Sequence, residues 1–448
     1  MSGNSIPLPL TSAKVKNTPL KGELTVPADK SISHRSLIFA SLANGISTIN
    51  NLLEGEDVLR TAEAMINMGA QISKKPDGSW QVNGVSTAGL VEPKTVLNMG
   101  NAGTAARLLM GLVCPFDFTC FFSGDNSLNK RPMKRIFDPI TQIGAKVVAR
   151  QDNFLPAAII GAEDPIAINY QMPVASAQVK SAILLAALNI MGTTTVIEPN
   201  KCRDHTEIMM RHLGLDIKTK DINNKQGTEI TLKGGQEFAA QNFNIPSDIS
   251  SAAFIIVAAL IIPNSEIVIR NVGINPLRDG IITTLKEMNG DIELVNQRNV
   301  SGEKVADIKV KYSKLKGANV PASRAPIMID EYPILAIAAA NAEGITKMNG
   351  LEELKVKESN RLSAIATGLR SCGVELKEGE DYLEISGGFK EPEELINIQT
   401  HMDHRIAMSF LIMGLKLTNG LKIDDSQMIN TSFPGFKDLF KKFGINFF

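Results

Sequence analysis

The sequence has few cysteines and few aromatic residues, and its charges cancel. None of the four cysteines forms a CxxC pair, so we expect free thiols in a reduced, cytoplasmic chain rather than a disulfide framework. The formal net charge is zero, which argues against a general nucleic-acid-binding protein. The apolar run at 252–262 is too short to span a bilayer, and the N-terminal residues show no long apolar run of a secretory signal.

Motifs for common cofactors are also missing from the sequence. The histidines show no HExxH spacing, and no GxSxG motif of a serine hydrolase occurs. The glycine-rich stretch 100–104 has neither the GxxxxGK[ST] nor the GxGxxG spacing of nucleotide sites. It still allows the backbone to approach a small anion closely, because glycine has no side chain. We therefore expect no metal site and no nucleotide cofactor.

The chain repeats itself. With 448 residues it is long enough for two domains. One recurring unit is an amphipathic helix, a glycine and a short apolar strand, and its six copies recur at intervals of roughly 70 to 83 residues, which indicates a repeat architecture. The glycines are expected to be left-handed helix caps. They are Gly69, Gly144, Gly214, Gly290, Gly373 and Gly444.

A second recurring unit alternates with the first. It is a helix rich in Ala, Leu and Ile that is apolar nearly all round and should be buried, followed by a turn and a β-rich segment. The copies occupy 34–49, 104–122, 179–197, 250–269, 333–348 and 405–423. Six copies divide into two α/β domains of three. We expect an N-terminal domain at 25–245 and a C-terminal domain at 246–448, completed by 1–24.

Basic residues recur where the buried helices begin. A capping role explains the Ser, Asn and Asp side chains at any single helix start, and is sufficient for the start at 246–251. Capping does not explain cations, because the helix dipole opposes positive charge at this end. An anion nearby is expected to compensate them. The cations are Lys30, Arg35, Arg107, Lys180 and Arg405.

Two stretches between the repeats concentrate charge further. The stretch 129–135, NKRPMKR, is either a solvated loop or part of an anion site. The stretch 354–361, LKVKESNR, places Glu358 three residues before Arg361, which in most helices is an ordinary surface pair. Asp330 and Glu358 lie amid the cations and are candidate acid–base residues. From residue chemistry alone, the chain binds one or two ligands with several negative charges.

Ordered motifs over nearly the whole chain resemble the enolpyruvyl transferase family. They are PADKSISHR, GNAGTAARL, DNSLNKRPM, ASAQVKSAILLAAL, RDHTE, IDEYPILAIAAA, LKVKESNRL and HMDHRIAMSF. Several look like the second bacterial subgroup of the branch that acts on shikimate 3-phosphate. The resemblance implies two similar α/β domains, each of three repeated βαβαββ units around buried helices (an inside-out α/β barrel), with the substrates in the interdomain cleft.

The resemblance also implies a reaction and its site residues. The enolpyruvyl group of phosphoenolpyruvate would be transferred to the 5-hydroxyl of shikimate 3-phosphate with release of phosphate, by a cytoplasmic monomer without metal or organic cofactor. Asp330 would be the base at the hydroxyl and Glu358 the acid at the methylene carbon, with Lys30 sharing the proton transfer. The implied substrate-binding residues are Lys30, Ser31, Arg35, Asn101, Gly103, Thr104, Arg131, Ser176, Ala177, Gln178, Arg203, Asp330, Lys357, Arg361 and Arg405.

The sequence departs from the family pattern at two places. Other branches carry a basic residue before the Phe-Pro near the C-terminus, whereas here the segment reads NTSFP at 430–434, so that an anion contact is absent or supplied elsewhere, for example by Lys437. Tolerant members of the second subgroup carry alanine where this chain has Gly103. We therefore expect inhibition by glyphosate in competition with phosphoenolpyruvate.

Three alternative functions can be compared with the sequence. The sibling transferase acting on UDP-N-acetylglucosamine normally has Lys-Asn near its start and a reactive cysteine on a mobile loop, whereas here Lys30 precedes Ser31 and 129–135 contains no cysteine. A non-catalytic sensor of phosphorylated ligands would be favoured if the acid–base residues were missing, and they are present. A nucleic-acid end-processing enzyme on a related fold would have a basic surface.

Overall fold

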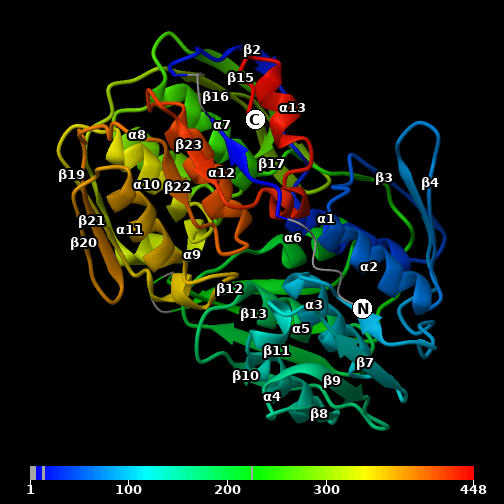
Figure 1. The fold of residues 1–448 in the computed structure, drawn as a ribbon. Coiled ribbons are helices and arrows are strands. Elements are labelled where there is room, and N and C mark those ends of the chain that lie inside the picture. The colour runs from blue at the N-terminus through cyan, green and yellow to red at the C-terminus, as the bar shows by residue number, and fades with distance from the viewer. Residues whose placement is uncertain (1–6, 13–15, 223, 225) are drawn as a thin grey trace. The chain divides into compact units, whose positions relative to one another are not determined.

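The computed structural model describes residues 7–12, 16–222, 224 and 226–448. These residues divide into two compact units, whose elements are labelled in Figure 1. The N-terminal unit comprises 28–246 and the hairpin tip 299–303. The C-terminal unit comprises the described part of 1–27 with 247–298 and 304–448. Each unit has its own cluster of buried apolar residues, so each is described separately.

The N-terminal unit contains three four-stranded sheets of one pattern. In each, a short strand pairs in parallel with the next strand, and the remaining pairs are antiparallel. The orders are β14-β3-β5-β4, β6-β7-β9-β8 and β10-β11-β13-β12. The strands are β3 (Ile46–Asn50), β4 (Gln71–Lys74), β5 (Trp80–Asn83), β6 (Leu97–Asn98), β7 (Thr119–Ser123), β8 (Lys146–Arg150), β9 (Phe154–Ile160), β10 (Asn169–Gln171), β11 (Thr193–Glu198), β12 (Ile217–Ile222), β13 (Gly227–Lys233) and β14 (Phe243–Asn244).

Six helices connect these strands. Those that the sequence predicts to be buried are α1 (Lys30–Leu42), α3 (Gly103–Val113) and α5 (Ala177–Ala187), and nearly all of their residues are buried. The amphipathic ones are α2 (Glu56–Asn67), α4 (Lys134–Ile143) and α6 (His205–His212). In chain order, β6-α3-β7-α4-β8-β9 and β10-α5-β11-α6-β12-β13 are complete βαβαββ repeats, which confirms the predicted repeat.

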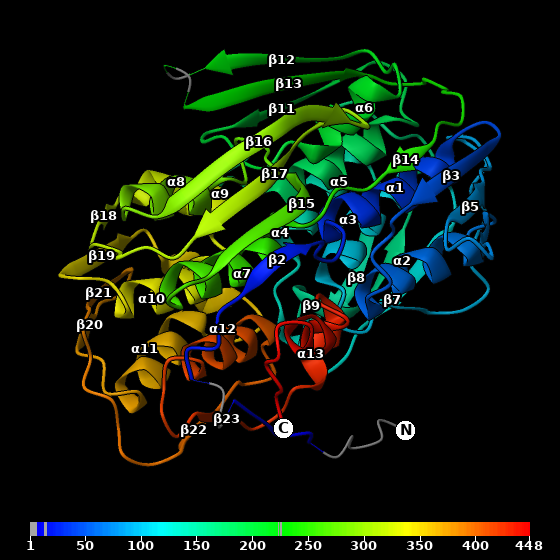
Figure 2. The ribbon, with the colours of Figure 1, turned by 90° about the horizontal axis from the view of Figure 1, so that it is seen from above.

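The C-terminal unit follows the same plan, and its sheets are β16-β17-β15-β2, β18-β19-β21-β20 and β1-β23-β22. Figure 2 shows the four strands of the first sheet side by side. The strands are β1 (Leu10–Thr11), β2 (Lys21–Leu24), β15 (Glu266–Gly273), β16 (Asp291–Val300), β17 (Glu303–Lys311), β18 (Asn319–Val320), β19 (Ile345–Asn349), β20 (Leu376–Glu378), β21 (Tyr382–Ser386), β22 (Ile396–Ile398) and β23 (Leu421–Ile423). The sheets of each unit remain separate, and the described strands form no closed barrel.

The helices of this unit again alternate between buried and amphipathic. The buried ones are α7 (Ile249–Ile261), α10 (Tyr332–Ala340) and α12 (His404–Gly414). The others are α8 (Gly280–Glu287), α9 (Ala325–Met328), α11 (Arg361–Ser371) and α13 (Phe436–Lys441), with the 3₁₀ segment η3 (Glu352–Val356) before α11. The side chain of Asp248 caps α7 by accepting from the Ser250 N–H at 2.7 Å, which confirms the capping interpretation of that helix start.

Five of the six repeat glycines have the left-handed backbone that the sequence predicts, but Gly290 does not. After α8 the left-handed residue is Asn289, with φ 68°, because asparagine also tolerates this conformation. Gly290 is needed for a different reason. A Cβ added to it would lie 2.7 Å from the Leu285 carbonyl oxygen, so a larger residue would not fit there.

Candidate functional site

Helix α1 begins with a cap and an ion pair. Asp29 accepts a hydrogen bond from the Ile32 N–H at 2.9 Å, which satisfies one of the unpaired amides at the helix start. Lys30 follows and forms an ion pair with Asp57 in the first turn of α2. Asp57 is buried. The anion that compensates Lys30 is thus a residue that the sequence analysis did not identify.

Arg35 lies inside the N-terminal unit, where it is 4% exposed. Its guanidinium donates to Thr206 Oγ1 on α6 and to Ser181 Oγ on α5, both at 2.7 Å, and to the Ser31 carbonyl at 3.0 Å. Burial lowers the pKa of Arg35 to about 10. Arg35 therefore links the N-terminal ends of α1, α5 and α6.

Gln178 joins the first turns of α3 and α5. Its Nε2 donates to Thr104 Oγ1 at 3.0 Å, and its Oε1 accepts from the Arg107 guanidinium at 3.0 Å. A Cβ added to Gly103 would lie 3.0 Å from an Arg107 nitrogen and 3.1 Å from an Arg131 nitrogen. Glycine at 103 therefore avoids a tight contact with two guanidinium groups.

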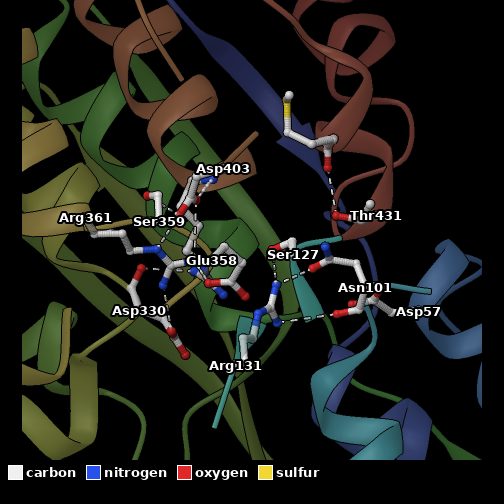
Figure 3. Close-up of polar contacts among 12 residues, drawn as sticks. Asp57, Asn101, Ser127, Arg131, Asp330, Glu358, Ser359, Arg361, Asp403 and Thr431 are labelled. Carbon is white, nitrogen blue, oxygen red and sulfur yellow. Dashed lines mark hydrogen bonds and ion pairs between the residues drawn. The ribbon is translucent and has the colours of Figure 1, made fainter. Parts of the chain in front are cut away.

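Arg131 is the buried member of the NKRPMKR stretch, whose other cations Lys130, Lys134 and Arg135 are exposed. Arg131 donates to Asn101 Oδ1 at 2.5 Å and to Ser127 Oγ at 3.1 Å (Figure 3). The solvated-loop interpretation is therefore wrong for Arg131, which is held toward the start of α3.

The remaining predicted residues of the N-terminal unit lie at the starts of α5 and α6. Ser176 is the N-cap of α5 and accepts from the Val179 N–H at 3.4 Å, and Ala177 is the first residue of that helix. Arg203 is half-buried in the loop before α6. Backbone amides at helix starts, together with nearby cations, form an environment that suits phosphate.

In the C-terminal unit, one cation is held by three carboxylates, which Figure 3 shows around Arg361. Arg361 begins α11 and is 1% exposed. Its nitrogens lie 3.2 Å from Asp330 Oδ1, 2.5 Å from Glu358 Oε2 and 2.8 Å from Asp403 Oδ2. Burial by itself lowers the pKa of Arg361, but Asp403, Glu358 and Asp330 outweigh burial and raise it. The surface-pair interpretation of Glu358 and Arg361 is therefore wrong.

Arg405 is placed beside the same group. Its guanidinium donates to the Asp330 carbonyl at 3.1 Å and lies 3.7 Å from Glu331 Oε1. The backbone N–H of Arg405 donates to Oδ1 of Asp403, whose side chain caps α12. Lys357 follows η3 and is half-buried. The structure thus brings Asp330, Glu358, Arg361 and Arg405 together, as the sequence predicts.

Asp57, Asp403 and Glu331 were missed by the sequence analysis although each contacts a predicted cation. Asp403 lies in the motif HMDHRIAMSF and Glu331 in the motif IDEYPILAIAAA. Membership of these motifs was the signal that could have identified both residues. Asp57 had no comparable signal.

Within the described ranges, no group of histidine, cysteine, aspartate and glutamate side chains has the arrangement of a metal site. No helix formed by the described residues is both long and apolar enough to cross a membrane.

Comparisons with known proteins agree with one another. The family model of EPSP synthase (3-phosphoshikimate 1-carboxyvinyltransferase) matches residues 15–440. A 3-phosphoshikimate 1-carboxyvinyltransferase of Paramagnetospirillum magneticum is 52% identical over 436 residues, which cover 97% of each chain. One from Pseudomonas sp. (strain PG2982) is 49% identical over 449 residues, covering 99% of this chain and 98% of the relative.

Solved structures give the same result. EPSP synthase from Acinetobacter baumannii superimposes with a TM-score of 0.86 at 41% identity, covering 98% of this chain and 99% of the other. The enolpyruvyl transferase NikO from Streptomyces tendae superimposes with a TM-score of 0.75 over 99% of both chains, but at 15% identity this likeness concerns the fold alone.

Proposed function

The chain belongs to the EPSP synthase family and is a transferase of the shikimate pathway, and we propose that it transfers the enolpyruvyl group of phosphoenolpyruvate to the 5-hydroxyl of shikimate 3-phosphate. The observation that supports this proposal most directly is the group of Asp330, Glu358 and Arg405 around buried Arg361. It combines two proton-transfer groups with two cations, which is what the addition and elimination steps require.

The first step is an addition. The 5-hydroxyl oxygen attacks C2 of phosphoenolpyruvate while Asp330 takes the hydroxyl proton and Glu358 gives a proton to C3. The product is a tetrahedral intermediate with a methyl group, two carboxylates and two phosphates. In the second step the C2–O bond to phosphate breaks as Asp330 gives its proton to the leaving phosphate oxygen, and the Glu358 carboxylate takes a proton from the methyl group to restore the double bond. Lys30 shares this proton transfer.

The charge of the intermediate explains the number of cations. Preorganised guanidinium and ammonium groups stabilise developing negative charge without rearranging during the reaction. Arg361 fits this description because three carboxylates fix its orientation. The proposed ligands of phosphoenolpyruvate are Lys30, Gly103, Arg131, Arg361 and Arg405.

Shikimate 3-phosphate is assigned to the helix starts of the N-terminal unit and to two residues of the other unit. The amides at the start of α5 and the Arg203 side chain suit its phosphate. The proposed ligands are Ser31, Arg35, Asn101, Thr104, Ser176, Ala177, Gln178 and Arg203, with Asp330 and Lys357 at the shikimate ring. We also propose that the two units are the functional domains of a cytoplasmic monomer.

Phosphate release tests the proposal. The purified protein is incubated with phosphoenolpyruvate and shikimate 3-phosphate, each alone and both together, with EDTA and without nucleotide. We expect phosphate to be released when both substrates are present, and not when either substrate is present alone. Tight binding of shikimate 3-phosphate without turnover would instead indicate a sensor, and turnover with UDP-N-acetylglucosamine in its place would identify the sibling activity.

A further inference from the structure

A charged cluster lies inside the N-terminal unit and consists of residues that were given no role in proton transfer. Lys180 on α5 has a side chain that is 0% exposed, and its Nζ lies 2.9 Å from Glu198 Oε2 and 2.7 Å from Glu207 Oε1. The same Nζ donates to the Cys202 carbonyl at 3.3 Å. The Cys202 thiol donates to Glu198 Oε2 at 3.0 Å. Lys180 therefore binds the end of β11, the following loop and α6.

The ammonium of Lys180 is charged. Burial by itself lowers the pKa of Lys180, but the nearby Glu207, Cys202 and Glu198 outweigh burial and raise it above its ordinary value. Burial also raises the pKa of Glu207. The anion expected to compensate Lys180 at its helix start is thus provided by the protein itself.

Such a cluster is a poor way to stabilise a helix that is otherwise apolar. Removing charges from water is costly, and buried ion pairs can often be replaced by apolar residues of similar volume without loss of stability. The neighbours of Lys180 on α5 are mainly Ala, Ile and Leu, which pack well without any charge. What distinguishes Lys180 from an apolar residue is that it fixes a loop at one defined place.

That loop carries a proposed ligand. Cys202, whose carbonyl Lys180 holds, directly precedes Arg203. On the other side, the Lys180 N–H donates to the Ser176 carbonyl at 3.0 Å, so Lys180 is one turn from the start of α5. Lys180 thus connects two segments to which shikimate 3-phosphate is assigned.

We propose that Lys180 is a positioning residue for shikimate 3-phosphate, which sets Arg203 relative to Ser176 and Gln178 by holding the Cys202 carbonyl and both glutamates. This inference rests on the proposed function. The positioning role requires no direct contact between Lys180 and the substrate. The consequence is a specific loss of affinity for one of the two substrates when Lys180 is removed.

The test uses Lys180→Met, which keeps an unbranched side chain only one atom shorter and removes the ammonium. Calorimetry measures the Kd of shikimate 3-phosphate, and steady-state kinetics measure kcat and both KM values. We expect the Kd and KM of shikimate 3-phosphate to rise about tenfold, since small displacements of binding groups have large effects. The KM of phosphoenolpyruvate and kcat at saturation should change much less.

Lys180→Met leaves two buried carboxylates without their cation and therefore risks a failure to fold. A second variant, Lys180→Met with Glu198→Gln and Glu207→Gln, leaves no buried charge in the cluster and should fold. It should show the same loss of shikimate 3-phosphate affinity. The matched control is Lys218→Met, which removes an exposed lysine of the same unit.

Three outcomes overturn the positioning role. They are unchanged affinity for shikimate 3-phosphate in a folded variant, an equal rise in both KM values, and a failure of both variants to fold, which would assign the cluster to stability. Failure of the proposed function is recognised separately, because the unsubstituted protein would then release no phosphate from the two substrates.

Discussion

Arg361 illustrates how a single residue organises the chemistry proposed for the C-terminal unit. Its guanidinium contacts the proposed base Asp330, the proposed acid Glu358 and the helix cap Asp403. A cation removed from water is stable only when it is paired in this way. The two acid–base groups are therefore held by hydrogen bonds to one fixed point.

Glu358→Gln should lower kcat by roughly 10²- to 10⁴-fold, which is the usual contribution of a positioned proton donor. The amide oxygen can still accept from Arg361, so that the fold and the affinity for shikimate 3-phosphate should be retained. Phosphate-release kinetics and calorimetry measure the two quantities. Glu352→Gln, an exposed glutamate in η3, is the control. An unchanged kcat would remove Glu358 from the mechanism.

We propose that glyphosate competes with phosphoenolpyruvate, and Gly103→Ala should then weaken this inhibition more than it weakens catalysis. The added methyl group would lie about 3 Å from nitrogens of Arg107 and Arg131, where an inhibitor longer than phosphoenolpyruvate has least room to spare. Inhibition constants against phosphoenolpyruvate for both proteins give the answer. Equal constants would show that Gly103 does not determine the response.

Among the elements, the buried helices show how close packing depends on individual glycines. Helices α3 and α5 pack against each other in the core of the N-terminal unit, and a Cβ added at Gly111 would overlap the backbone of Ala182 on α5. Backbone atoms in a packed helix cannot move aside as a side-chain end can, because interiors are close-packed.

Gly111→Ala should therefore destabilise the protein by about 1 to 3 kcal/mol. Gly103→Ala is the matched control, since it lies in the same helix and its Cβ would meet flexible side chains rather than backbone. Urea unfolding of the two variants measures the free energies of unfolding. Equal midpoints would mean that α3 and α5 can separate slightly without loss.

Over the whole molecule, all four thiols are buried and free. Burial raises the pKa of Cys372 to about 12, and burial with help from Glu92 raises the pKa of Cys120 to about 12. With these raised pKa values both thiols remain protonated at pH 8. They should therefore be unreactive, because the thiolate is the reactive form.

Ellman's reagent at pH 8 should accordingly label less than one thiol per native chain in the time that labels all four in urea. The sibling transferase with its reactive cysteine would show rapid labelling of one thiol before unfolding. Such labelling here, without a change in structure by circular dichroism, would contradict the burial of these residues.

The sequence by itself determined what depends on residues close together in the chain. The alternation of helices and strands, the six buried helices, the capping of α7 by Asp248 and the left-handed backbone at Gly69 or Gly144 follow from periodicity and local chemistry, whereas the βαβαββ order came from the family resemblance. The motifs also indicated the family. Gly290 shows the limit of local reasoning, because the neighbouring Asn289 competes for the same conformation.

Only the tertiary structure decided which anion compensates which cation. Asp403 lies 42 residues from Arg361, and Lys30 is paired with Asp57 on a different helix. Lys180 is paired with Glu198 and Glu207 in the interior instead of facing a ligand. Charge patterns in a sequence do not carry this information, because the partner of a buried charge is set by the packing of helices that are distant in the chain.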